Sequence, residues 1–318
     1  MPELIGSHTN TNGTPPLAVP APRAAEPMRV LEERFPLLLA LASDEPAVAA
    51  IRLTQALALS RGAVPTVLRA LGDVRAAEAS ATPLAGAVVE AYLGPDYLDE
   101  CRGALEQQVT SVAGEVDWKL QVTDEMPVGA IVDEALALRA GLIVMGLRRH
   151  GVLRRMITRD LLAEVVRVAR VPVLAVRPEL TGLPRRVVVA VDFSTASVRA
   201  AFLARRLLAD DGTLFLVHVT PVNSDETRAQ LDRIIEDIRP SPEMTASSIQ
   251  LHGDVQSAIE GCALAVDADL LAVGSDDHTL LDQLTVGSMS MKLAHRARWS
   301  TLVVPGRPGE ATPRAVRA

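Results

Sequence analysis

Two glycines and a serine near the end of the chain have the spacing of a phosphate-binding loop. Gly274 follows an aliphatic run, and Gly287 and Ser288 stand at the expected start of a helix. Glycine lets the backbone approach a ligand closely, and a helix N-terminus presents unpaired N–H groups that favour phosphate. The Ser288 hydroxyl can cap that helix or bind a phosphate oxygen. The spacing therefore predicts an anion site between residues 274 and 288.

Two further residues are expected at the same edge of the fold. Asp192 ends the aliphatic run that begins at Val187, and Val219 ends the next such run. In an open parallel sheet, ligands bind beyond the carboxyl ends of the strands, where the strand order reverses. We therefore expect Asp192, Val219 and Gly274 to lie together at such a point.

Short aliphatic runs alternate with segments of helical spacing in the second half, which predicts β-α-β units and a parallel sheet. The run 187–191 is continuously apolar, as in a strand covered on both faces. Later strands are expected at 213–219, 247–251, 269–273 and 301–304, with helices at 197–209, 225–238, 255–266 and 288–297.

The first half follows the same order. Strands are expected at 37–41, 64–71, 118–122, 142–145 and 173–176, and helices at 46–60 and 97–112. Residues 76–94 are extra material compared with the second half. Pro65 near the start of its strand lacks a backbone donor and predicts an irregular entry.

The two halves repeat each other. Ile131 and Gly146 correspond to Ile259 and Gly274 at a constant separation of 128 residues. Earlier in each half, Gly62 corresponds to Gly212 and Ala42 to Asp192, at a separation of 150 residues. A repeat of this length indicates a duplicated domain, in which each copy is large enough for its own core.

The predicted fold is therefore α/β, with two tandem doubly wound domains, each a five-stranded parallel sheet flanked by helices. We expect the domains at 35–178 and 185–306, joined by a short linker that two prolines stiffen. Residues 1–34 are polar and rich in helix-breaking residues, which predicts a disordered tail. Residues 307–318 are expected to form a loose C-terminal tail.

Composition excludes several classes of protein. The net charge is −7 and aromatic residues make up 3%, which disfavours nucleic-acid binding. The two cysteines, Cys101 and Cys262, form no metal-binding pair, so we expect both to be small apolar residues on helices. No run is long enough to cross a membrane and no secretory signal is evident, so we expect a cytoplasmic protein.

The residues of the second half resemble the universal stress protein family, whose fold is Rossmann-like and adenine nucleotide alpha hydrolase-like. The resemblance rests on residues 189–194, 217–219 and 274–288 and extends in two copies over 35–305. In the family's ATP-binding members, the strand-one Asp and strand-two Val frame the adenosine, and the loop glycines and Ser hold the phosphates. The resemblance implies an ATP site, with magnesium, formed by Asp192, Val219, Gly274, Gly287 and Ser288.

Asp277 departs from that pattern, because it stands where the family's loop has its second glycine. A carboxylate ~5 Å from a phosphate charge costs roughly 3 kcal/mol per charge pair at an effective dielectric constant of about 20, before screening. A divalent cation that bridges Asp277 and phosphate would reverse the sign of this effect. The alternatives at this point are a nucleotide site and a silent pocket.

The first half departs further. Ala42 stands in the place of Asp192, and Arg69 in the place of Val219, while Gly146 is retained. The other loop positions carry Arg149, Arg159 and Asp160. The basic cluster within 148–159 fits either an anion or acidic-partner site or a solvated loop.

The resemblance implies a role in the stress response. Phosphate-loop, dinucleotide and nucleophile-elbow motifs are absent from the sequence, so we expect binding rather than catalysis. Slow ATP hydrolysis is a weaker alternative that stays open, because no residue is poised as a base. The family dimerises through the fifth strand, which implies that 173–176 pairs with 302–304 as an intramolecular pseudo-dimer. A further homodimer and a protein partner stay open. The alternative function is a nucleotide-independent interaction or scaffold protein with both pockets silent.

Overall fold

The computed structural model describes residues 35–41, 48–72, 95–147, 155–238, 241–275 and 299–306. The expected tails at 1–34 and 307–318, the whole extra segment 76–94, and the expected helix 288–297 lie outside these residues.

The first half contains five strands and four helices within the described ranges. They are β1 (Phe35–Ala40), α1 (Val48–Arg61), β2 (Ala63–Ala70), α4 (Pro95–Ala113), β3 (Lys119–Thr123), α5 (Pro127–Ala137), β4 (Leu142–Gly146), α6 (Arg155–Val168) and β5 (Val173–Val176). Pro65 lies inside β2, opposite Leu37 of β1, and the pairing of β2 with β3 begins one residue later, at Thr66.

The second half repeats this succession where the structure describes it. Its elements are β6 (Arg186–Ala190), α7 (Thr195–Leu207), β7 (Thr213–Val219), α8 (Asp225–Ile238), β8 (Thr245–Leu251), α9 (Val255–Ala265), β9 (Leu270–Ser275) and β10 (Ser300–Pro305). Every strand expected from the sequence is present, with ends that differ from the expected ones by at most two residues.

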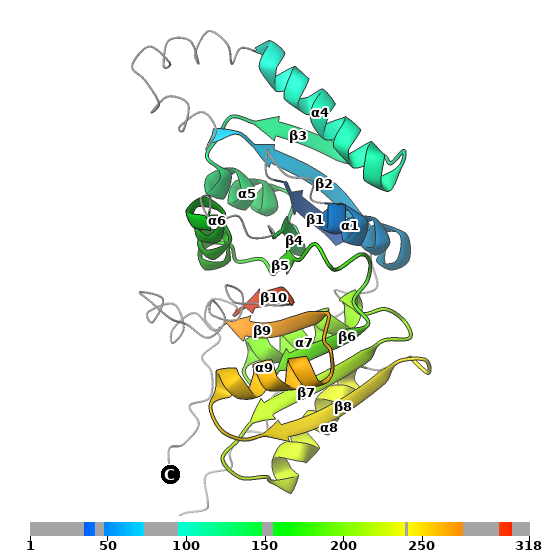
Figure 1. Ribbon diagram of the computed structural model, residues 1–318, viewed down its shortest axis with the longest axis vertical. Helices are drawn as coiled ribbons and strands as arrows, with labels where there is room; N and C mark the ends of the chain where they lie inside the picture. The colour runs from blue at the N-terminus through cyan, green and yellow to red at the C-terminus, as the bar shows by residue number, and fades with distance from the viewer. Residues whose placement is uncertain are drawn as a thin grey trace, which may run out of the picture. The chain divides into compact units, whose positions relative to one another are not determined.

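The strands form one sheet in the order β3-β2-β1-β4-β5-β10-β9-β6-β7-β8, which Figure 1 shows from one end to the other. Within each half all neighbours are parallel, and the first strand of the half lies in the middle. The predicted fold class is therefore confirmed: each half is a five-stranded, doubly wound parallel sheet flanked by helices.

The two halves join through β5 and β10, which are the only antiparallel neighbours among the described strands. Leu302 lies opposite Leu174, and Thr301 lies opposite Ala175. Since Leu174 and Leu302 are 128 residues apart, equivalent residues of the two halves face each other. The join therefore has the geometry of a local two-fold axis that passes through the sheet.

The sequence analysis expects a separate core in each copy, and the structure corrects this expectation. On one face of the sheet, residues of α1, α4, α7 and α8 pack into a single hydrophobic cluster that extends across both halves. On the other face, one cluster lies under α5 and α6 and another under α9. Because the local two-fold axis passes through the sheet, α1 and α7 lie on the same face and share one core.

None of the helices among the described residues has the length and apolarity to cross a membrane. In the same part of the chain, no three His, Cys, Asp or Glu side chains gather into a group that could hold a metal ion.

Candidate functional site

The strand order reverses in the second half at β6, which lies between β7 and β9. Ala190 of β6 lies opposite Val217 of β7 on one side and Val273 of β9 on the other. The three carboxyl ends therefore meet at a topological switch point, where open α/β sheets bind ligands. Asp192, Val219 and Gly274 come from these three strand ends, as the sequence predicts.

Asp192 and two serines build the turn between β6 and α7. The Ser194 N–H donates to Oδ1 of Asp192 over 3.0 Å, and the Ser197 N–H donates to Oγ of Ser194 over 3.2 Å. The Asp192 N–H in turn donates to Oγ of Ser197 over 3.3 Å. Ser194 is thus the N-cap of α7, and its cap satisfies one of the helix's orphan donors.

The same contacts set the charge of Asp192. Partial desolvation raises the pKa of its carboxyl, but hydrogen bonds from Ser194 and Ser197 outweigh this effect, so the pKa lies below its ordinary value. Asp192 is therefore ionised at neutral pH, and the residue stays accessible to water. A carboxylate has about four lone-pair sites, so it keeps capacity for further donors.

The turn also contains a strained residue. Phe193 has a φ of 63°, in the left-handed region that large side chains rarely occupy. Its ring lies 4.8 Å, centroid to centroid, from the His218 ring, and Nδ1 of His218 lies 2.7 Å from the Val191 carbonyl oxygen. Strain of this kind is common where a loop is held for binding.

The close backbone contact of Gly274 is with the protein itself. A Cβ at this position would lie 2.4 Å from the Ser197 nitrogen and 2.6 Å from the Ala196 carbonyl carbon. The sequence analysis attributes this glycine to ligand approach, whereas the structure gives it a second role: the end of β9 packs directly against the first turn of α7. The glycine therefore fixes the two elements that border the switch point.

The other predicted site residues are placed less completely. Val219 ends β7 opposite Leu251 and packs, partly buried, against the cluster under α9. Gly287, Ser288 and Asp277 lie outside the described residues. The switch point thus contains three of the five predicted binding residues.

The first half requires a correction. Ala40 lies opposite Leu68, and its counterpart Ala190 lies opposite Val217, so β2 and β7 correspond at a separation of 149 residues. Arg69 therefore takes the place of His218, and Ala70 takes the place of Val219. The expected match of Arg69 with Val219 is wrong, because the two halves differ by one residue in the turn before these strands.

Arg69 is nonetheless buried, and it donates to Oε1 of Gln108 on α4. Its Nε has no hydrogen-bond partner among the described residues. Desolvation lowers the pKa of its guanidinium. A buried cation thus fills the position where the second half holds a histidine. Ala42 and Arg149 lie outside the described residues, as do the side chains of Arg159 and Asp160.

The two halves also match one family of sequences. The model of the universal stress protein family matches residues 35–177 and again residues 184–305. The chain belongs to the universal stress protein family. It is a tandem member, since the match occurs twice, as the resemblance implies. The domain boundaries at 35–178 and 185–306 stay a prediction.

Solved structures of universal stress proteins have the same fold. One from Archaeoglobus fulgidus is 18% identical, with a TM-score of 0.64, and the match covers 86% of this chain and 97% of the other. A putative universal stress protein from Pseudomonas aeruginosa is 16% identical, with a TM-score of 0.55, over 87% and 95% of the two chains. The comparison with curated proteins gives no match.

Sequence reasoning did not assign a role to Ser197 or to the turn that it forms with Asp192 and Ser194. The signal is present, because Asp192 precedes a serine by two residues and Ser194 is followed by another serine three residues later. Asp and Ser at such spacings are typical of Asx turns and helix N-caps.

Proposed function

We propose that this universal stress protein binds an adenine nucleotide, ATP with magnesium, in its second half and acts in a stress response by binding rather than by turnover. The observation that supports this function best is the switch point, where ionised Asp192 lies beside the start of α7 and the ends of β7 and β9.

The residues fit such a ligand in distinct ways. Asp192 offers carboxylate oxygens to ribose hydroxyls, and Val219 offers an apolar contact to the base. Gly274 starts the loop toward Gly287 and Ser288, whose N–H groups and hydroxyl would hold phosphates. A magnesium ion would neutralise phosphate charge near Asp277.

The first half is then a structural partner with a degenerate pocket, in which Arg69 is buried against α4. We place the protein in the cytoplasm, as an intramolecular pseudo-dimer joined by β5 and β10. A homodimer and an unidentified protein partner are compatible with this function.

The second candidate function is a nucleotide-independent interaction protein with both pockets silent. Two observations favour it: Asp277 replaces a loop glycine, and Gly274 is occupied by packing against α7. Under this alternative the glycines are retained for the fold alone.

A calorimetric titration with ATP and magnesium, together with thermal unfolding, separates the two functions. Ligand at 100 times its Kd should stabilise the native state by about 2.7 kcal/mol. Asp277→Gly should bind ATP more tightly, because it removes the like charge. Asp117→Gly, in an exposed loop of the first half, is the matched control and should bind as the wild type does.

The absence of heat and of any thermal shift with ATP, ADP or AMP at millimolar concentration, in the wild type and in Asp277→Gly alike, would reject the nucleotide site and favour the interaction protein.

A further inference from the structure

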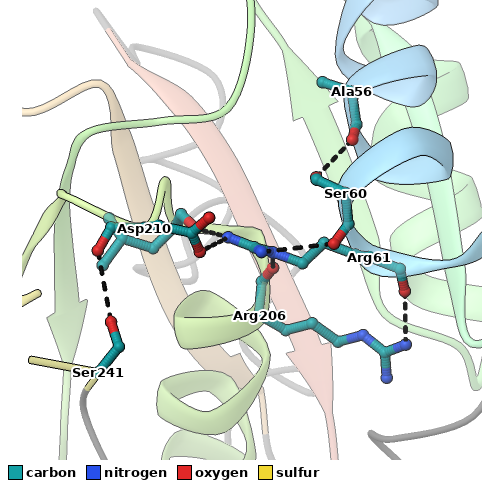
Figure 2. A network of polar contacts seen from close by, with 7 residues as sticks. Ala56, Ser60, Arg61, Arg206, Asp210 and Ser241 are labelled. Atoms are coloured by element: carbon teal, nitrogen blue, oxygen red, sulfur yellow. Dashed lines mark hydrogen bonds and ion pairs between the residues drawn. The ribbon is translucent and has the colours of Figure 1, made fainter. Parts of the chain in front are cut away.

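A group of side chains at the ends of α1 and α7 flanks the join between β5 and β10. We call it the interface cluster, and it consists of Phe35 and Arg61 from the first half and Arg206 and Asp210 from the second. Figure 2 shows Arg61 extended toward the end of α7, between Arg206 and Asp210.

Arg61 binds the C-terminal end of α7 through two nitrogens of its guanidinium. Its Nε donates to the Arg206 carbonyl oxygen over 3.1 Å, and its Nη2 donates to the Leu208 carbonyl oxygen over 2.8 Å. Nη2 also lies 2.6 Å from Oδ1 of Asp210. The Arg61 side chain is 16% exposed and its two carbonyl contacts are partly buried, whereas Asp210 is 62% exposed and its ion pair faces water. A cation at this place is stabilised both by the unpaired carbonyl groups of the last turn and by the negative end of the α7 dipole.

Arg206 returns the contact from the second half. Its Nη2 donates to the Arg61 carbonyl oxygen over 3.2 Å, and its guanidinium carbon lies 3.9 Å from the centroid of the Phe35 ring. Arg206 is 8% exposed, and desolvation, followed by the charge of Arg61, lowers the pKa of its guanidinium. Each half thus contributes an arginine that caps the last turn of the other half's helix.

The strands at the join do not distinguish one half from the other. Leu174 faces its own counterpart Leu302, and the residues on either side are small or β-branched. A first half could therefore pair its β5 with the β5 of another first half without losing backbone hydrogen bonds or apolar contact.

The interface cluster, by contrast, does not follow the local two-fold axis. Residues of α1 and α7 correspond at a separation of 150, since Ala50 and Ala200, and Leu57 and Leu207, are buried in equivalent positions. The counterparts of Phe35, Arg61, Arg206 and Asp210 are Arg185, Asp211, Ala56 and Ser60. At the separation of 149 found for β2 and β7, the counterpart of Arg61 is Asp210, which is also acidic.

Pairing of like halves would lose these contacts. Two second halves would place Asp210 against Asp211, which already pairs with Arg185 of its own half, and this aspartate, in the place of Arg61, would face the carbonyls of the α7 terminus. Like charges in such a setting are destabilising, and a carboxylate is unfavourable at a helix C-terminus. Two first halves would place Arg61 against Ser60 and Phe35 against Ala56, with neither ion pair nor cation–π contact.

We infer that the interface cluster is a specificity determinant, which makes the β5–β10 surface of each half fit the unlike half and reject a copy of itself. The partner that this surface accepts is a helix C-terminus bearing an arginine and an aspartate beside an aliphatic edge strand. The second half of the same chain supplies that partner.

The test uses the full-length chain and four variants. Arg61→Asp gives the first half the residue type of its counterpart and so reproduces a like-with-like join. The double variant Arg61→Asp with Asp210→Arg restores a pair of opposite charges, with the two charges exchanged. Asp210→Arg alone is the second variant with like charges. Arg52→Asp, at an exposed position of α1, makes the same change of charge away from the cluster.

Hydrogen exchange of peptides from β5 and β10 reports the join. In Arg61→Asp, exchange should be about tenfold faster than in Arg52→Asp, because a partly buried, charge-assisted set of hydrogen bonds is lost. The double variant should recover most of the protection. If β6 also loses protection in Arg61→Asp, Arg61→Gln and Arg52→Gln replace the two aspartate variants, and exchange should again be faster in Arg61→Gln. Equal exchange in Arg61→Asp and Arg52→Asp, or a double variant as open as Arg61→Asp, would overturn the inference.

Discussion

At the scale of single residues, the turn that contains Asp192 combines charge, capping and strain within a few positions. Asp192 is held ionised by Ser194 and Ser197, Ser194 caps α7, and Phe193 between them takes a left-handed φ. The turn is therefore shaped before any ligand arrives, which lowers the entropy cost of binding.

The lowered pKa of Asp192 makes stability depend on pH. A carboxyl whose pKa is lower in the folded state than in the unfolded state stabilises the fold above its unfolded pKa, near about 3.9, and this contribution is lost as pH falls through the folded pKa. Asp192→Asn should therefore be less stable than the wild type at neutral pH, and the difference should shrink below about pH 4.

Urea unfolding between pH 2 and 7 measures this difference. Asp237→Asn, on an exposed part of α8, controls for the loss of one negative charge. A constant difference between Asp192→Asn and the wild type across the whole range would show that the carboxylate's charge does not hold the turn.

The residue types were enough to predict Asp192, Val219 and Gly274 at one edge of the sheet. The residue of the second half that corresponds to Arg69 could be identified only from the strand pairing. The sequence match rested on Gly62 and Gly212, whose conformations differ. Gly62 has a φ of 67° directly after α1, whereas α7 ends at Leu207 and continues through a turn to Gly212. Glycine identity does not reveal which turn it forms, so the one-residue difference was hidden.

At the scale of elements, the contact between β9 and α7 fixes the geometry of the switch point. Gly274→Ala would place a methyl group 2.4 Å from the Ser197 nitrogen and 2.6 Å from the Ala196 carbonyl carbon. Both are backbone atoms of α7, which can move only with the whole helix. Overpacking of this kind should cost about 1–3 kcal/mol or more in the free energy of unfolding. The measurement is the urea midpoint.

Gly261→Ala is the matched control, because a Cβ there meets nothing within 4 Å on an exposed face of α9. It should leave stability unchanged or raise it by up to about 1 kcal/mol, as expected for alanine in a helix. Equal effects of the two substitutions on the urea midpoint would show that α7 does not pack closely against Gly274.

The elements were predictable where burial is strong. Strands β1, β4, β6 and β9 are central and covered on both faces, so each appears as a continuous aliphatic run. The edge strands β3 and β8 carry more polar residues and are only partly buried, and their starts were placed within two residues. The contact of α7 with Gly274 could not be predicted, because it depends on the path of two distant segments.

At the scale of the whole molecule, the shared sheet and the hydrophobic cluster under α1, α4, α7 and α8 tie the halves together. We expect the described body of the chain to unfold in one cooperative transition, because opening the join would expose apolar surface of both halves.

The chain carries one tryptophan in each half to test this. Trp118 precedes β3 and Trp299 precedes β10. Trp118→Phe and Trp299→Phe each leave one fluorescent probe, and both urea midpoints should coincide with that of far-UV circular dichroism. Separate midpoints for the two probes would show that the halves unfold independently.

The pairing of β5 with β10 inside one chain has a consequence for how the protein behaves on dilution. Two separate subunits joined in this way would come apart as their concentration falls, whereas covalently linked halves meet at a fixed effective concentration. The assembly is therefore insensitive to expression level. A half that does not have to assemble with identical copies can also lose its own ligand-binding residues and still support the fold of the other half.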